Sequence, residues 1–209
     1  MDTYIYFMRH GETDANKVLM VQGHTDVPLN SSGLSQAQCA GERLQQMNFD
    51  AIYSSDLSRA ATTAKYAAGS RDVIYTKELR EWYFGDWQGK TLTEIEKIYP
   101  EQFKLYKSNS PLFCPENGES AGEFIARVKK FMQDIARKHR GQNVLCVSHG
   151  GYIRTALQYV MNVEQLVMKP RVDNTSISRF KTADDGQTWQ LALWNDICHL
   201  KDFRESEGV

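Results

Sequence analysis

The sequence predicts an α/β protein, a three-layer α/β/α sandwich built on a mostly parallel sheet with one antiparallel strand. Two observations predict this fold. Short segments rich in β-branched and aromatic residues alternate with longer segments of helical periodicity, and this order favours a parallel sheet covered by helices on both faces. The last two predicted strands, residues 176–181 and 188–195, are joined by a short polar turn, and the antiparallel strand is expected there.

Six segments have the composition of β-strands. Each is short and is followed by glycine or by polar residues typical of loops. The segment at 143–148 is an almost continuous apolar run, which is typical of a strand buried on both faces. The predicted strands are residues 3–8, 50–54, 73–75, 143–148, 176–181 and 188–195.

Two helices are expected in the first third of the chain. Residues 29–47 begin with turn residues and continue with helix formers, and Ser35 with Gln38 resembles a capping box. A second helix is rich in alanine, whose small side chain allows close packing. Ser55 and Asp56 precede this helix and are expected to cap it.

The clearest helix of the chain opens with a capping box made by Ser120 and Glu123. Apolar residues follow it at spacings of four, three and four, which places them on one helical face: Phe124, Val128, Phe131 and Ile135. Two further helices are expected, one capped by Thr91 with Glu94 and ending near Pro100, and one starting at about Tyr152.

Residues 83–119 differ from the rest of the chain. Their periodicity is weak, and Pro100, Pro111 and Pro115 interrupt them. We predict that this segment is a lid insertion over the sheet. No repeat or linker divides the 209 residues, so we expect a single domain spanning residues 1–209.

Composition excludes several classes of function. Twenty-five Lys and Arg residues against 26 Asp and Glu residues give a net charge of −1, so no overall field favours nucleic acid or a membrane surface. The four cysteines are scattered without paired spacing, and we expect reduced thiols with neither a disulfide framework nor a zinc site: Cys39, Cys114, Cys146 and Cys198. No apolar run approaches membrane-spanning length and no leader sequence is evident, so a cytoplasmic location is expected.

Two histidines occupy equivalent places. His10 follows the first predicted strand and His149 follows the strand at 143–148, and each is succeeded by glycine. Ligands of open α/β sheets bind beyond the carboxyl ends of the strands. We therefore expect both histidines to face one pocket, with the helix after Gly150 directing its N-terminal amides towards an anion.

Two arginines are predicted to join them. Arg9 precedes His10, and Arg59 lies in the first turn of the helix after the second strand. Guanidinium groups bind phosphate oxygens in bidentate fashion and remain charged at physiological pH. A cation in the first helical turn is unfavourable next to the helix dipole, which favours an anionic partner for Arg59. These side chains suit a phosphate site that needs no metal or other cofactor.

The motifs around these residues resemble those of the histidine phosphatase superfamily, the phosphoglycerate mutase-like fold. The first is Arg9-His10-Gly11-Glu12-Thr13, followed by Asn16 and by Gln22-Gly23. Further blocks match in order, so the resemblance covers nearly the whole chain: Pro28-Leu29-Asn30, Tyr53-Ser54-Ser55 through Arg59-Ala60, Leu79-Arg80-Glu81 through Gly85-Asp86-Trp87-Gln88-Gly89, Ser148-His149-Gly150, and Asn174-Thr175-Ser176.

The resemblance implies a role for each matching residue. His10 is the implied nucleophile, forming a phosphohistidine. Arg9, Arg59 and His149 hold the phosphoryl oxygens. Glu81 protonates the departing alkoxide and then acts as base towards water. The implied contacts to the phosphate or its neighbours come from Asn16, Gln22, Gly23 and the amide of Gly150.

Three functions remain open at this point. The motifs favour hydrolysis of small phosphate monoesters, because the segment 10–16 lacks the tryptophan of the mutases and the segment 81–89 resembles the phosphatase branch. The alternatives are a cofactor-dependent phosphoglycerate mutase and a non-catalytic protein that binds phosphate ligands. Candidate substrates include phosphoglycerates, sugar phosphates and a nucleotide precursor similar to α-ribazole phosphate; the oligomeric state is not predicted.

Overall fold

A computed structural model describes residues 1–166 and 168–200. Within these residues, six strands form one sheet in the order β3-β2-β4-β1-β5-β6. β1 pairs in parallel with β4, β4 with β2, and β2 with β3, whereas β5 is antiparallel to both β1 and β6. The mostly parallel sheet with one antiparallel strand is confirmed. The strands are β1 (Thr3–Arg9), β2 (Ala51–Ser55), β3 (Ile74–Thr76), β4 (Asn143–Ser148), β5 (Ile177–Thr182) and β6 (Gln190–Asp196).

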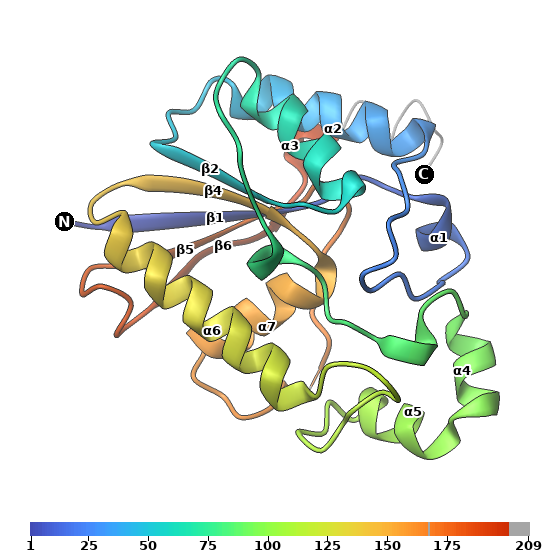
Figure 1. Ribbon diagram of the computed structural model, residues 1–209. Helices are drawn as coiled ribbons and strands as arrows, with labels where there is room; N and C mark the ends of the chain where they lie inside the picture. The colour runs from blue at the N-terminus through green and yellow to red at the C-terminus, as the bar shows by residue number, and fades with distance from the viewer. Residues whose placement is uncertain (167, 201–209) are drawn as a thin grey trace.

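Helices cover both faces of the sheet, as the three-layer prediction requires (Figure 1). One face carries α2 (Ser31–Leu44) and α3 (Ser58–Ala68), and the other carries α6 (Ala121–Lys138) and α7 (Gly150–Val160). Among the described residues, no helix is long and apolar enough to cross a membrane. Three short 3₁₀ turns complete the described chain: η1 (Lys77–Leu79), η2 (Gly85–Trp87) and η3 (Cys198–Leu200).

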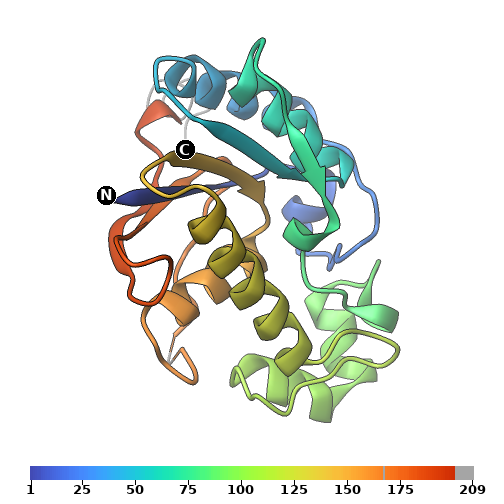
Figure 2. The ribbon, with the colours of Figure 1, turned by 60° about the vertical axis from the view of Figure 1, so that its left-hand side comes forward.

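Three short helices lie beyond the carboxyl ends of the parallel strands (Figure 1). They are α1 (Asp14–Lys17), α4 (Leu92–Ile98) and α5 (Pro100–Lys107). In Figure 2, α4 and α5 lie together at one corner of the molecule, next to the beginning of α6. The segment 83–119 has its own aromatic cluster, which includes Phe84, Phe103 and the fully buried Trp87. This segment thus has a small core of its own, and it lies beyond the carboxyl ends of the parallel strands, where the site is expected (Figure 1).

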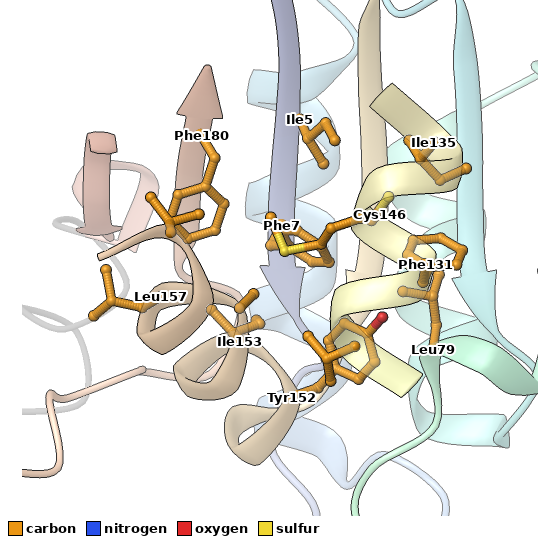
Figure 3. Packing of buried hydrophobic residues seen from close by; sticks show 14 of the residues in the cluster. Ile5, Phe7, Leu79, Phe131, Ile135, Cys146, Tyr152, Ile153, Leu157 and Phe180 are labelled. Atoms are coloured by element: carbon orange, nitrogen blue, oxygen red, sulfur yellow. The ribbon is translucent and has the colours of Figure 1, made fainter. Parts of the chain in front are cut away.

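The largest core cluster lies between the sheet and the helices α6 and α7. Figure 3 shows Phe7 and Cys146, which come from the sheet, facing Phe131, Tyr152 and Ile153 of these two helices. The opposite face is packed mainly against alanines of α3, which let that helix approach the sheet closely. The two cores fix the relative positions of β1, β2 and β4, whose ends carry the predicted site residues.

Local signals predicted some helix starts correctly. The Ser120 side chain accepts a hydrogen bond from the Glu123 amide, and Glu123 returns the contact, so the capping box of α6 is confirmed. The box made by Thr91 and Glu94 at the start of α4 is confirmed as well. Both boxes need only residues three positions apart, and no distant group competes for them.

The predicted cap of α2 is wrong. Asn30 caps this helix, and its side chain accepts a 2.8 Å hydrogen bond from the Gly33 amide. Ser35 lies inside the helix and donates to the carbonyl of Ser31. Gln38 bonds along the helix surface instead of reaching back to an amide. The helix starts earlier than predicted because Asn30 already has an extended backbone with a side-chain acceptor in place.

The predicted cap of α3 is also wrong. Leu57 occupies the cap position and offers no side-chain hydrogen bond. Ser55 is the last residue of β2, and its hydroxyl contacts the His149 ring. The Asp56 carboxylate forms an ion pair with Arg80, with contacts of 2.6 and 2.7 Å. Both expected capping side chains are thus engaged by residues that are distant in the sequence.

Candidate active site

His10 lies in the first turn after β1, in a loop held from three sides. Its amide donates to the carbonyl of Ser148, and its carbonyl accepts from the Asn174 side chain at 3.0 Å. The following Gly11 is required, because a Cβ there would lie 2.4 Å from the carbonyl oxygen of Gly33. These contacts hold His10 in place, and only 3% of the residue is exposed.

The hydrogen bonding of His10 determines which ring nitrogen can react. Nδ1 lies 2.7 Å from the Gly11 carbonyl oxygen. A carbonyl only accepts, so Nδ1 carries the proton and Nε2 keeps its lone pair. Burial lowers the pKa of His10 well below its ordinary value, and the nearby charges of Arg59 and Arg9 lower it further. His10 is therefore a neutral imidazole at neutral pH.

His149 follows β4 and lies beside His10, with 5.1 Å between the ring centroids. Its Nε2 is 2.9 Å from the Ser55 hydroxyl at the end of β2. Its Nδ1 is buried and has no hydrogen-bond partner among the described residues. Burial first, and then the charge of Arg59, lowers the pKa of His149 well below its ordinary value. The helix α7 begins immediately after this residue, earlier than the predicted start at Tyr152.

Arg9 and Arg59 both line the cavity that His10 lines, so their guanidinium groups bring positive charge to it. Arg9 donates to the Val172 carbonyl at 2.7 Å, and Arg59 donates to the carbonyls of Gly23 and Thr25 at 2.7 and 2.8 Å. Burial is the main reason that both pKa values are lowered to about 10, so both groups stay charged near neutrality.

The Nε atoms of Arg9 and Arg59 are buried without a partner in the described part of the chain. Arg59 as a whole is only 1% exposed. Buried donors and buried cations without a compensating group are costly. An anion between the two guanidinium groups would satisfy both of them.

Glu81 is held at the N-terminus of α7. Its carboxylate accepts hydrogen bonds from the amides of Trp82 and Gly151, both at 2.9 Å. Its carbonyl accepts from His24 at 2.8 Å and from Arg127 at 3.2 Å. A Cβ on Gly151 would lie only 2.3 Å from Glu81 Oε1, so this close approach depends on glycine.

One cavity of about 430 Å³ connects these groups. Its size is typical of a site for a small molecule. His149 is not among the residues that line it, so the expectation that both histidines face the pocket is met by His10 alone; the His149 ring contacts the His10 ring instead. The other predicted site residues all line the cavity: Arg9, His10, Asn16, Gln22, Gly23, Arg59, Glu81 and Gly150.

The predicted binding residues differ in their contacts. The Asn16 side-chain oxygen Oδ1 accepts from the amide and the hydroxyl of Thr13, so this side chain orders its own loop. Gln22 has a buried side-chain oxygen with no partner among the described residues. Gly23 has a φ of +52° and uses its carbonyl to hold Arg59. Gly150 starts α7, whose N-terminus faces the cavity.

The sequence did not predict two cations that line the same cavity, Arg154 and Lys169. Arg154 follows Gly150 by four residues and therefore lies on the same face of α7, so helical periodicity was a usable signal for it. Lys169 lies in the segment before β5, where no periodic pattern marks it. Within the described residues, no group of three or more His, Cys, Asp or Glu side chains gathers where it could hold a metal ion.

The site combines an uncharged imidazole, two buried guanidinium groups and a carboxyl group around one cavity, with a second imidazole packed against the first. Such an arrangement can bind a phosphate group, attack it and exchange a proton with the leaving group.

Comparison with known proteins agrees with this chemistry. The family model of the histidine phosphatase superfamily (branch 1) matches residues 5–197. Phosphoglycerate mutase-like protein 4 of Arabidopsis thaliana is 38% identical over 203 residues, which cover 95% of this chain and 87% of the relative. The metal-independent phosphoserine phosphatase of Arabidopsis thaliana is 34% identical over 203 residues, covering 95% of this chain and 83% of the relative.

A solved structure extends the agreement to three dimensions. Phosphoserine phosphatase of Entamoeba histolytica in complex with 3-phosphoglyceric acid superposes with a TM-score of 0.85 at 30% identity, covering 95% of this chain and 99% of that one. The predicted family and the predicted fold are confirmed. This chain belongs to the histidine phosphatase superfamily, branch 1, and is a phosphatase with a phosphoglycerate mutase-like fold.

Proposed function

We propose that this protein hydrolyses small phosphate monoesters through a phosphohistidine on His10, with Glu81 as general acid and base. The observation that carries the proposal is the state of His10. Its Nδ1 is bonded to its own chain, so the unprotonated Nε2 is the ring nitrogen left for a ligand in the cavity. Burial, and then the charges of Arg59 and Arg9, keep the ring neutral, and the two arginines supply positive charge for a phosphate.

In the first step, the lone pair of His10 Nε2 attacks phosphorus and the bond from phosphorus to the ester oxygen breaks. Glu81 gives its proton to the departing alkoxide, so an alcohol leaves. Arg9 and Arg59 donate to the phosphoryl oxygens through groups that include their unpartnered Nε atoms. These charges stabilise the transition state more than the ground state as negative charge develops.

His149 is proposed to be a neutral donor in this step. The Ser55 hydroxyl lies 2.9 Å from Nε2 and can donate to it, which leaves the proton on Nδ1. Nδ1 is the buried atom without a partner, so it is free to donate to a phosphoryl oxygen.

In the second step, water attacks the phosphohistidine. Glu81, now a carboxylate, takes a proton from the water, and the bond from phosphorus to Nε2 breaks. Inorganic phosphate leaves, and His10 returns to its neutral form. Glu81 recovers its proton for the next cycle.

The remaining predicted binding residues have supporting roles in the proposal. The amide of Gly150 and the N-terminal end of α7 attract the phosphate. Gln22 lines the cavity and would donate to an oxygen through its side-chain NH₂ group, and Gly23 positions Arg59. Asn16 acts mainly by ordering its loop, and the Asn174 side chain links this loop to the His10 carbonyl.

The segment 83–119 is proposed to be a lid within a single domain of residues 1–209. Phe84, Tyr106 and Phe113 of this segment line the cavity. Their apolar surfaces would keep bulk water away from the ester and strengthen the charges beside it.

The proposed partner is a small phosphate ester, with neither nucleic acid nor a membrane involved, and the proposed location is cytoplasmic. The net charge of −1 supports a small phosphate ester as the partner, because positive charge is concentrated in the cavity instead of spread over a surface. The scattered cysteines, which form no disulfide among the described residues, support the cytoplasmic location.

The test is turnover of p-nitrophenyl phosphate in the presence of EDTA, comparing the wild type with His10→Ala, together with rapid acid-free quenching to trap a phosphohistidine. We expect EDTA-resistant turnover and a trapped phosphoenzyme that are both lost in the variant. Circular dichroism controls for folding of the variant. Turnover that survives in His10→Ala would refute the proposal.

The same experiment separates the alternatives. A phosphoenzyme that forms but transfers its phosphate to a phosphoglycerate instead of to water would indicate a mutase. Binding of phosphate esters without turnover and without phosphoenzyme would indicate a non-catalytic binding protein.

A further inference from the structure

The backbone at His10 is bonded to a threonine that lies outside the cavity. The Thr175 amide donates to the Arg9 carbonyl at 3.1 Å and to the His10 carbonyl at 3.4 Å, and the Thr175 hydroxyl lies 3.2 Å from Nε2 of His199. We propose that this contact between Thr175 and His199 is a clamp that holds His10 in position to attack phosphorus. Neither residue of the clamp lines the cavity, so both are positioning residues that act through His10. The inference rests on the proposed function, which makes His10 the nucleophile.

The backbone conformation of Thr175 is unusual for a threonine. The residue has a φ of +55°, in a turn of residues 173–176 that the Ser176 amide closes by donating to the Asp173 carbonyl at 3.1 Å. Glycine or asparagine usually occupies a turn position with this backbone, because a β-branched side chain is strained there. Such a conformation persists only where the surrounding contacts hold it. The hydroxyl of Thr175, which glycine would lack, supplies one of these contacts.

The ring of His199 is oriented to donate to this hydroxyl. Arg43 Nη1 lies 3.4 Å from Nδ1 of His199, and a guanidinium group can only donate. Nδ1 therefore accepts, which leaves the proton on Nε2 for Thr175. Burial, followed by the charge of Arg43, lowers the pKa of His199 to about 4, so the ring is neutral at neutral pH. Arg43 is itself fixed by a 2.6 Å contact with Asp196.

The clamp joins separate parts of the fold to the loop after β1. Arg43 lies in α2, Asp196 is the last residue of β6, and His199 lies in η3. Thr175 is fully buried, so its contacts are shielded from water, which strengthens them. The position of the His10 loop therefore depends on side chains that come from the helical layer and from the end of the sheet.

Loss of the clamp should displace the reacting nitrogen. His10 Nδ1 is bonded to the Gly11 carbonyl, so the ring follows the backbone of its own loop. The Arg9 guanidinium group is held separately, by the Val172 carbonyl at 2.7 Å. A shift of the loop would therefore misplace His10 Nε2 and leave the phosphate-binding charges in place. The expected effect is a slower attack on phosphorus with little change in phosphate binding.

Two pairs of variants separate the hydrogen bond from the shape of the side chains. Thr175→Val removes the hydroxyl and keeps the branched shape, whereas Thr175→Ser keeps the hydroxyl. His199→Ala removes the donor, whereas His199→Gln keeps an amide that can accept from Arg43 and donate to Thr175. The matched control is Thr182→Val, at the opposite end of β5. Thr182 is also buried, and its hydroxyl accepts from the Gly186 amide at 3.0 Å, away from the cavity.

The test measures phosphorylation of His10 in a single turnover of p-nitrophenyl phosphate. The p-nitrophenolate leaves with little help from an acid, so a slower release reports on the nucleophile and not on Glu81. We expect Thr175→Val and His199→Ala to lower this rate by about 10- to 100-fold, the effect of a small misplacement of a reacting group. Thr175→Ser and His199→Gln should recover most of the rate, and Thr182→Val should keep it. The Kd of inorganic phosphate, measured by calorimetry, should be the same in all variants.

Hydrogen exchange of the Thr175 amide gives a readout that does not depend on activity. We expect faster exchange in Thr175→Val and His199→Ala than in the wild type, and unchanged exchange in Thr182→Val. If His199→Ala does not fold, the two Thr175 variants decide the question.

Three results would overturn the inference: unchanged exchange in Thr175→Val, faster exchange with an unchanged single-turnover rate, or equal rate losses in Thr175→Val and Thr182→Val. A wild type that forms no phosphoenzyme would refute the proposed function, and the inference with it. Failure of the clamp alone is distinguished from that result because the wild-type phosphoenzyme would still form.

Discussion

Gly151→Ala is expected to displace the Glu81 carboxyl group and to slow hydrolysis of alkyl phosphates by about 100-fold. The added Cβ would lie 2.3 Å from Glu81 Oε1 and 3.0 Å from the carboxyl carbon. The backbone of Gly151 is helical, so alanine introduces no strain of its own. The three nearest atoms to the added Cβ all belong to the Glu81 carboxyl group, so the substitution acts mainly on this group.

The magnitude follows from the distance that the carboxyl group must move. Ordinary contacts of a Cβ begin at 3.4 Å, so Oε1 must retreat by roughly 1.1 Å. A misplacement of about 1 Å in a catalytic group costs on the order of 100-fold in rate, which corresponds to about 2.7 kcal/mol in the activation free energy.

The assay compares kcat for an alkyl phosphate with kcat for p-nitrophenyl phosphate. The alkoxide needs a proton to leave, whereas p-nitrophenolate departs with little help, so only the alkyl phosphate should show the full loss. Gly122→Ala is the control, because a Cβ at this position of α6 meets no atom within 4 Å. An unchanged kcat for the alkyl phosphate, or equal losses for both esters, would refute the role assigned to Glu81.

Two further predictions concern the support of the site and its pH dependence. Arg127→Lys is expected to lower kcat for alkyl phosphates with little change in KM. Arg127 donates to the carbonyls of Glu78, Arg80 and Glu81, and lysine cannot make the same forked contacts. A changed KM with an unchanged kcat would contradict this positioning role. Urea titrations should show that the free energy of unfolding falls as the pH drops below about 6.5. In the folded protein the pKa values of His10 and His149 are lowered, and that of His199 is lowered to about 4. The unfolded chain therefore binds protons on these histidines that the folded protein does not bind. The fall is at most about 1.4 kcal/mol per pH unit for each histidine, and a flat profile between pH 7 and 5 would show that these rings are not held neutral.

The reacting end of the site was predictable from the sequence. His10, His149 and Arg59 each follow a strand, and β1, β4 and β2 are neighbours in the sheet. The carboxyl ends of parallel strands meet at one edge, so polar residues at these ends converge whatever the details of packing. Their roles in catalysis remain predictions, which the experiments above test.

The far end of the cavity was not predictable in the same way. Lys169 reaches the cavity because its segment is bonded to the end of α5: the Asn109 side chain donates to the Leu166 carbonyl, and Lys169 itself donates to the Tyr106 carbonyl. These contacts join residues about sixty positions apart. No local pattern in the sequence encodes them.

The sequence by itself determined the order of the strands and of the helices that cover the sheet, though not the helix α5, and it determined the helix starts at Thr91 and Ser120. Periodicity and capping boxes depend on contacts within a few residues. Only the tertiary structure decided what Ser55 and Asp56 do. Their side chains were expected to cap α3, but His149 and Arg80 engage them instead. A short polar side chain bonds to whichever partner the fold brings near, and at the end of a buried strand that partner comes from another part of the chain.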